Sequence, residues 1–207
     1  AVQKSGADVF PITHKQALEI FPQFRLGKKD LILSDQTAGL LAASNICVGL
    51  KSWLIEQNVA FIENSRVHQY EVGGTCLSLH TKDAIIKTQG AIFCIGPWTS
   101  KLFPFLKSKL TTTHQHVFYW HLSKPELGTL SNFPVWVEIG ATHLDNWYGL
   151  PSFGIPGIKA ARHNLSTDDD PDTLPSLTDE TLKESQNKLQ QRLYPQIKGL
   201  SKWEPCK

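Results

Sequence analysis

The sequence predicts an α/β protein of the α+β kind, and three observations support this class. Helical stretches with apolar residues at three- and four-residue spacing alternate with short β-prone runs. Residues 90–96 are apolar at successive positions, as in a strand that is covered on both faces. The chain has 207 residues, of which 41% are hydrophobic and 19% charged, which suits a globular core and excludes coiled coils, collagen and general disorder.

The first half predicts helices followed by short strands. Thr13 is a typical N-cap for a helix over residues 13–20. Ser44 or Asn45 is expected to cap a second helix that ends at Asn58. Four β-prone runs follow, separated by turn residues: 59–62, 66–72, 75–80 and 84–87. Gly73-Gly74 predicts a hairpin turn between two of them.

The apolar run over residues 90–96 predicts a buried parallel strand that ends at Gly96. Cys94 falls inside this run, so we expect a buried structural thiol there and not a nucleophile. The other cysteines, Cys47, Cys76 and Cys206, are widely spaced, which favours a reducing compartment, the cytoplasm or, in a eukaryote, the peroxisome.

The second half is richer in predicted strands, which cover residues 111–122, 135–139, 147–153 and 158–163. The last two are expected to form a hairpin across a turn rich in glycine and proline. A final helix should begin near Thr178 and end before Pro195.

Charge and hydropathy argue against two classes of partner. Lys and Arg number 21 and Asp and Glu 19, interspersed along the chain, so no basic face is predicted for nucleic acid. No apolar run approaches the roughly 20 residues that span a bilayer. We expect neither nucleic acid nor a membrane as a partner.

Two polar clusters could suggest metal sites. His114, His116 and His121 lie close in sequence, but no Cys, Asp or Glu completes a ligand set, so surface or hydrogen-bonded histidines are favoured over zinc. The acidic run over residues 168–172 lacks the glycine and distal glutamate of a calcium loop and predicts a solvated loop. We expect no metal.

Several motifs together resemble a known family. They are the segment from Tyr148 to His163 (YGLPSFGIPGIKAARH), residues 91–100 (AIFCIGPWTS), Asp170-Pro171-Asp172-Thr173 and the terminal Glu204-Pro205-Cys206. In this order and spacing they resemble the monomeric sarcosine oxidase group, which includes pipecolate and N-methyltryptophan oxidases, within the D-amino acid oxidase superfamily of FAD-dependent enzymes.

The resemblance implies a fragment of an interleaved two-domain enzyme. Residues 1–39 and 105–203 would belong to a substrate domain with a mixed, mainly antiparallel sheet flanked by helices. Residues 40–104 would form part of a Rossmann-like FAD-binding domain, to which the chain returns at 204–207. The sequence has no GxGxxG turn for the FAD pyrophosphate and no methionine, so we expect a piece of a longer protein that alone neither holds FAD nor is active.

The resemblance also implies roles for individual residues. Tyr148 would line the substrate cavity, Lys159 would stand near the flavin edge where oxygen reacts, and His163 would border the same pocket. The cofactor residues would be Gly96, Pro97 and Trp98 beside the flavin, Val67 near its nucleotide end, and Cys206 as a covalent link to the ring. Taken alone, the same residues could equally be packing or surface positions.

The implied activity is the oxidation of a secondary, N-methyl or cyclic amino acid to an imine by a monomeric enzyme, with oxygen reduced to hydrogen peroxide. Two alternatives stay open. A flavin-dependent dehydrogenase would act on a similar amine without using oxygen, and a non-catalytic remnant would be only a binding module.

Overall fold

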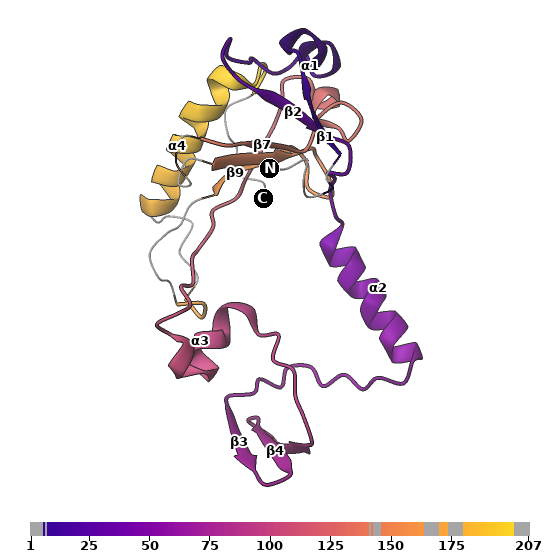
Figure 1. The fold of residues 1–207 in the computed structure, drawn as a ribbon, viewed down its shortest axis with the longest axis vertical. Coiled ribbons are helices and arrows are strands. Elements are labelled where there is room, and N and C mark those ends of the chain that lie inside the picture. The colour runs from indigo at the N-terminus through magenta and orange to yellow at the C-terminus, as the bar shows by residue number, and fades with distance from the viewer. Residues whose placement is uncertain are drawn as a thin grey trace. The chain divides into compact units, whose positions relative to one another are not determined.

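The computed structural model describes residues 6, 8–140, 142, 146–163, 170–173 and 180–200 (Figure 1). The predicted start of the last helix near Thr178 and the predicted flavin link at Cys206 lie outside these residues. The chain divides into two compact units. The first unit comprises Ala1–Leu40, Thr113–Thr167 and Leu174–Lys207, and the second comprises Leu41–Thr112 and Asp168–Thr173. The assignment of these units to substrate and FAD-binding domains stays a prediction.

The first unit is built on a four-stranded antiparallel sheet. Its strands are β6 (Phe118–Trp120), β7 (Trp136–Glu138), β8 (Asn146–Leu150) and β9 (Ile158–His163), in the order β6-β9-β8-β7. Strands β8 and β9 form the predicted hairpin, with Tyr148 opposite Ala161. A two-stranded ribbon of β1 (Val9–Ile12) and β2 (Ile32–Asp35) belongs to the same unit.

One face of the large sheet is covered by the long helix α4 (Glu180–Gln196), which contacts β9 (Figure 1). Alternate strand residues, such as Trp147 and Ile158, point to this face and pack with Leu193 of the helix. The core cluster consists of Phe118, Trp120, Leu122, Phe133, Trp147, Ile158, Ala160, Leu189, Leu193 and Ile197. The core therefore lies between α4 and one side of the sheet.

Helix α1 (His14–Ile20) begins as the sequence predicts. The hydroxyl of Thr13 accepts a hydrogen bond from the backbone N–H of Gln16, and the Gln16 side chain accepts one from the backbone of Thr13. This reciprocal capping box satisfies two donors at the helix start. Just after the helix, the backbone N–H of Arg25 donates to Gln196 at the end of α4 over 2.7 Å.

The second unit contains helix α2 (Ala43–Glu56) and the predicted three-stranded meander. Its strands are β3 (Gln69–Gly73), β4 (Cys76–His80) and β5 (Ile85–Thr88), in the order β3-β4-β5. Asn58 ends the α2 region with φ of 61°, a left-handed conformation that Asn tolerates. Helix α2 has Ala42 and not Ser44 or Asn45 as its N-cap, with no side-chain cap.

Two predicted strands of this unit do not form. Residues 59–62 and 91–95 lie in no strand, Ile92 is 93% exposed, and Cys94 is exposed. A parallel strand exists only where neighbouring strands pair with its backbone, and the described sheet of this unit consists of β3, β4 and β5 alone. The apolar composition of these residues therefore does not lead to strand pairing. The expectation of a buried Cys94 is wrong.

The predicted end of the last helix also needs correction, since Pro195 lies inside α4 and the helix continues to Gln196. Among the helices of the described residues, none has both the length and the apolar character needed to cross a bilayer.

Candidate functional site

The β8–β9 hairpin brings three predicted site residues to one face of the large sheet. Successive residues of a strand point to opposite faces, and directly paired residues share a face. Lys159, Ala161 and His163 therefore project on one side of β9, and Tyr148 joins them because it pairs with Ala161. This side is opposite to the one that α4 covers, because Ile158 and Ala160 belong to the core.

The burial of these side chains suits a shallow site. Tyr148 and Lys159 are half-buried, His163 is exposed, and Ala161 between them is buried. A small residue at position 161 leaves the neighbouring side chains room above the sheet. This face thus carries a phenol, an ammonium and an imidazole, with Lys159 and His163 on either side of Ala161 along β9.

Sequence reasoning missed one residue of this face. Tyr119 on β6 pairs directly with Lys159 and is half-buried. In the sequence it lies within the run Phe118-Tyr119-Trp120, where every residue is aromatic, so no alternation marks which side chain faces the core. Only the pairing of β6 with β9, about 40 residues along the chain, places Tyr119 beside Lys159.

Electrostatics link the two tyrosines. Burial raises the pKa of Tyr148 above its ordinary value of 10.0, and the nearby Tyr119 adds to the increase. Both causes disfavour the phenolate. Tyr148 therefore stays a neutral hydrogen-bond donor throughout the physiological pH range.

The turn before β9 holds the backbone that leads into Lys159. Gly157 has φ of 98°, and a Cβ atom there would lie 2.8 Å from the carbonyl oxygen of Trp120. Only glycine combines that conformation with so close an approach to β6. Nearer the start of the turn, the backbone N–H of Ser152 donates to the carbonyl of Gly128 over 2.7 Å. The turn is thus anchored on both sides.

In the second unit, the predicted cofactor segment forms the short 3-10 helix η2 (Gly96–Trp98), followed by α3 (Thr99–Leu102). Gly96 has φ of 52°, and the space where a Cβ would stand is open. The Thr99 hydroxyl donates to the Gly96 carbonyl over 2.6 Å, and the Thr112 hydroxyl donates to the Pro97 carbonyl over 3.3 Å. These hydrogen bonds hold the segment through the Gly96 and Pro97 carbonyls, while the position of a Cβ atom at Gly96 stays open.

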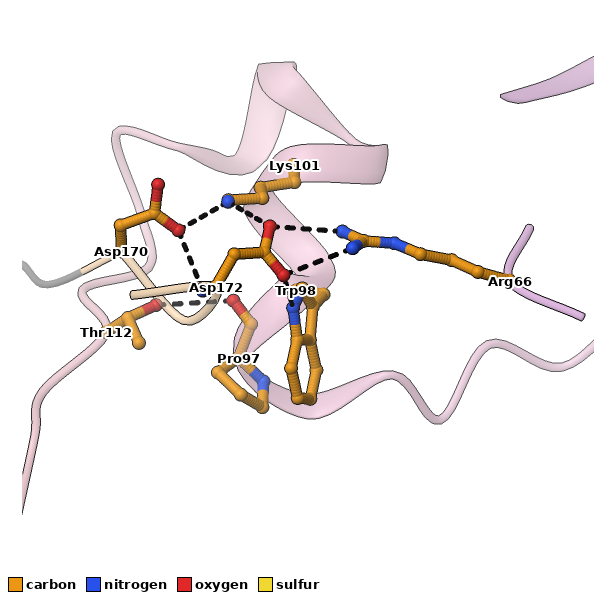
Figure 2. Close-up of polar contacts among 7 residues, drawn as sticks. All are labelled: Arg66, Pro97, Trp98, Lys101, Thr112, Asp170 and Asp172. Atoms are coloured by element: carbon orange, nitrogen blue, oxygen red, sulfur yellow. Dashed lines mark hydrogen bonds and ion pairs between the residues drawn. The ribbon is translucent and has the colours of Figure 1, made fainter. Parts of the chain in front are cut away.

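A polar cluster surrounds the carboxylate of Asp172 (Figure 2). Arg66 donates two hydrogen bonds to its two oxygens, at 3.1 and 3.3 Å, and the indole N–H of Trp98 donates a third at 2.8 Å. Lys101 forms ion pairs with both Asp172 and Asp170. The backbone N–H of Asp172 in turn donates to the Asp170 carboxylate over 2.9 Å.

Of the predicted solvated acidic loop, residues 168 and 169 lie outside the described residues, and Asp170 and Asp172 are exposed but also paired with cations. Lys101, then Arg66 and Trp98, hold the pKa of Asp172 far below its usual range, and Lys101 lowers the pKa of Asp170. Asp170 and Asp172 in turn raise the pKa of Lys101. The stretch from Asp170 to Asp172 is therefore a set of paired anions attached to the second unit.

Two further predicted cofactor residues have different outcomes. Val67 is half-buried and directly follows Arg66, whose side chain pairs with Asp172. Cys206 lies outside the described residues. The roles assigned to Val67, Cys206 and the other site residues stay predictions.

The histidines that raised the question of zinc have another partner. A ring nitrogen of His116, Nδ1, lies 2.8 Å from the hydroxyl of Ser185 on α4, and the rings of His114 and His116 are 5.4 Å apart. Within the described ranges, no three His, Cys, Asp or Glu side chains gather where a metal could bind.

The described residues fit part of a flavin site. An open glycine at positive φ lets a flat ring approach the backbone at Gly96, and the indole of Trp98, 39% exposed, lies two residues further on. Arg66 pairs with Asp172, and Lys101 pairs with both Asp172 and Asp170, so the two cations are offset by two carboxylates. The fit therefore concerns the ring and not the pyrophosphate.

Comparison with known proteins confirms the resemblance found in the sequence. The chain is 23% identical over 145 residues to monomeric sarcosine oxidase from Bacillus sp. (strain NS-129), which covers 68% of this chain and 36% of that protein. Among solved structures, NikD, an unusual amino acid oxidase essential for nikkomycin biosynthesis, superposes in its open form with a TM-score of 0.71.

The NikD match has 14% sequence identity and covers 97% of this chain and 51% of NikD. A variant of NikD in the open form gives a TM-score of 0.70 with the same identity and coverage. No family model matches the chain. The chain thus has the fold of about half of an amino acid oxidase.

Proposed function

We propose that this chain, with its amino acid oxidase fold, is part of an FAD-dependent enzyme that oxidises a secondary, N-methyl or cyclic amino acid to an imine. The observation that carries the proposal is the sheet face on which Tyr148, Lys159 and His163 gather. The family resemblance points to the same three residues. The three residues lie on the face of the sheet that α4 does not cover, which supports a common site.

In this proposal, bound FAD would accept a hydride equivalent from the amine and pass the electrons to oxygen, which gives hydrogen peroxide. The side chains of the sheet face orient the substrate. Neutral Tyr148 donates a hydrogen bond, and the imidazole of His163 borders the amine.

Lys159 provides fixed positive charge. Reduction of oxygen develops negative charge, and an ammonium held beside that position stabilises it without reorganising solvent. The anchored turn at Gly157 and the pairing with Tyr119 and Leu150 hold the Lys159 backbone on both edges of β9. A rigid strand is a better support for such a charge than a loop.

The cofactor would be held by the second unit. Gly96 offers bare backbone to the ring, Pro97 and Trp98 follow it, and Val67 would lie toward the nucleotide end. Cys206 would form the covalent link, as in the group that the sequence resembles. The chain supplies no GxGxxG turn, so the pyrophosphate would be held by other residues of the full-length protein.

The experiment that tests the proposal uses the full-length protein and a panel of N-methyl, cyclic and primary amino acids. We expect oxygen consumption and stoichiometric hydrogen peroxide with at least one secondary amine. Turnover with an artificial electron acceptor but without peroxide would indicate the dehydrogenase. A protein that contains no flavin and turns over no amine would contradict the proposal and favour the binding module.

A further inference from the structure

The Asp172 carboxylate collects donors from three separate places in the second unit. Arg66 precedes the meander, Trp98 ends the 3-10 helix η2, and Lys101 lies in α3 (Figure 2). Asp172 itself lies 74 residues after Trp98 and 106 after Arg66. One carboxylate therefore joins two of the three stretches of the chain that the family resemblance assigns to the cofactor.

We infer that Asp172 is a positioning residue for the flavin: its carboxylate holds the Trp98 indole and the Arg66–Val67 backbone where the ring and the nucleotide end require them. This role rests on the proposed function. It goes beyond that function because Asp172 acts through its neighbours and does not contact the flavin.

The geometry favours positioning over direct binding. Each oxygen of Asp172 accepts a hydrogen bond from Arg66, and one also accepts the indole N–H. Bidentate pairing with a guanidinium fixes the orientation as well as the distance of both groups. An unpaired carboxylate beside the cofactor would repel its phosphates, whereas the charge of Asp172 is offset by the two cations that it contacts.

Asp170 is a matched control within the same segment. It carries the same charge and pairs with Lys101, but it contacts neither Arg66 nor Trp98 among the described residues. Removing its charge changes the net charge by the same amount as removing that of Asp172. If the segment mattered only as an attached loop, both substitutions would have similar effects.

The test compares three variants of the full-length protein: Asp172→Asn, Asp170→Asn and Asp172→Glu. The FAD dissociation constant is measured by titration of the apoprotein, and the thermal unfolding midpoint of each apoprotein is recorded beside it. Spectra of indole N–H groups report the Trp98 hydrogen bond directly. We expect Asp172→Asn to weaken FAD binding about tenfold, the worth of one charge-assisted hydrogen bond.

Asp170→Asn should change the FAD dissociation constant much less, and Asp172→Glu should restore part of the loss because the charge is kept. The Trp98 N–H signal should shift in Asp172→Asn and stay in place in Asp170→Asn. High salt should reduce the difference in FAD dissociation constant between Asp172→Asn and the unchanged protein, because salt screens exposed ion pairs.

Equal FAD affinity in the unchanged protein and Asp172→Asn would overturn the role of Asp172 and leave the proposed function intact. Equal losses in Asp172→Asn and Asp170→Asn would also overturn it. If the unchanged full-length protein fails to bind FAD, the proposed function itself is wrong, which is a separate outcome from these two.

Discussion

Tyr119 lies directly opposite Lys159 in the antiparallel pairing of β6 with β9. On the other edge of β9, Tyr148 pairs with Ala161, two residues after Lys159 and on the same face. Two phenols therefore flank the strand that carries the ammonium. Strand pairing fixes these positions more firmly than any loop could, which is the property that an electrostatic role for Lys159 requires.

Replacing Lys159 with Met tests the oxygen step. The substitution removes the charge and keeps much of the stem, so the packing of β9 should survive. We expect the reoxidation of reduced flavin by oxygen to slow by about 10²–10³-fold, the usual effect of removing one preorganised electrostatic contact. Anaerobic reduction by the amine should change less. Stopped-flow measurement of the two half-reactions in the full-length enzyme separates them.

Lys183→Met provides the control for that experiment, because Lys183 is an exposed residue of α4. It removes the same charge from the protein without touching the sheet face. An unchanged oxygen step in Lys159→Met, or an equal slowing in both variants, would make Lys159 an ordinary surface lysine.

Tyr119→Phe should lower the pKa of Tyr148. Burial is the main cause of its raised pKa and remains in the variant, so the pKa should fall but stay above 10.0. Because the folded state keeps this proton more tightly than the unfolded state, Tyr148 contributes stability below its unfolded pKa and loses it as pH rises through the folded value. Carbon-13 NMR of labelled tyrosine measures the titration.

Tyr194→Phe is the comparison for Tyr119→Phe, because Tyr194 lies on α4 and its ring packs against Trp120 on the core side. This substitution should leave the pKa of Tyr148 unchanged. An unchanged pKa of Tyr148 in the Tyr119→Phe variant would show that the two phenols do not interact.

Gly157→Ala should destabilise the first unit more than Gly154→Ala. Both glycines have positive φ, 98° and 72°, so alanine at either position costs about 1–2 kcal/mol in backbone strain. At Gly154 a Cβ meets nothing within 4 Å, whereas at Gly157 it would lie 2.8 Å from the Trp120 carbonyl oxygen. That clash should add roughly 1–3 kcal/mol. Denaturant unfolding of both variants gives the two free energies, and equal values would contradict the anchoring of the turn.

Local chemistry explains which elements could be predicted from the sequence. Thr13 and Gln16 form a capping box within four residues, and the β8–β9 hairpin has its turn residues between its strands. The prediction of a strand over residues 90–96 was wrong because an apolar run becomes a strand only when distant strands pair with it. Ala42 was missed as a cap because it makes no side-chain hydrogen bond that a pattern could indicate.

The same reasoning applies to the site. The family resemblance pointed to Tyr148, Lys159 and His163, and the pairing of β8 with β9 places them on one face. Tyr119 and Asp172 depend on pairings across about 40 and 74 to 106 residues. Such contacts leave no local signal in one sequence, and an acidic run by itself is typical of a solvated loop.

Cys206 carries a prediction that comes from the sequence alone. If it bonds to the flavin, acid precipitation of the full-length protein should leave the yellow colour in the pellet, and Cys206→Ser should release it to the supernatant. Cys47→Ser, at an exposed cysteine of α2, is the matched control and should keep the flavin in the pellet. Flavin that leaves the unchanged protein in acid would make Cys206 a structural thiol.

Anaerobic mixing of the full-length protein with a secondary amino acid tests the central claim most directly. The account predicts that the long-wavelength absorbance of the bound flavin bleaches in the absence of oxygen and returns, with one peroxide per flavin, when oxygen is admitted. A flavin spectrum that no secondary amine bleaches, or a full-length protein without flavin, would contradict the claim that this sheet face serves amine oxidation.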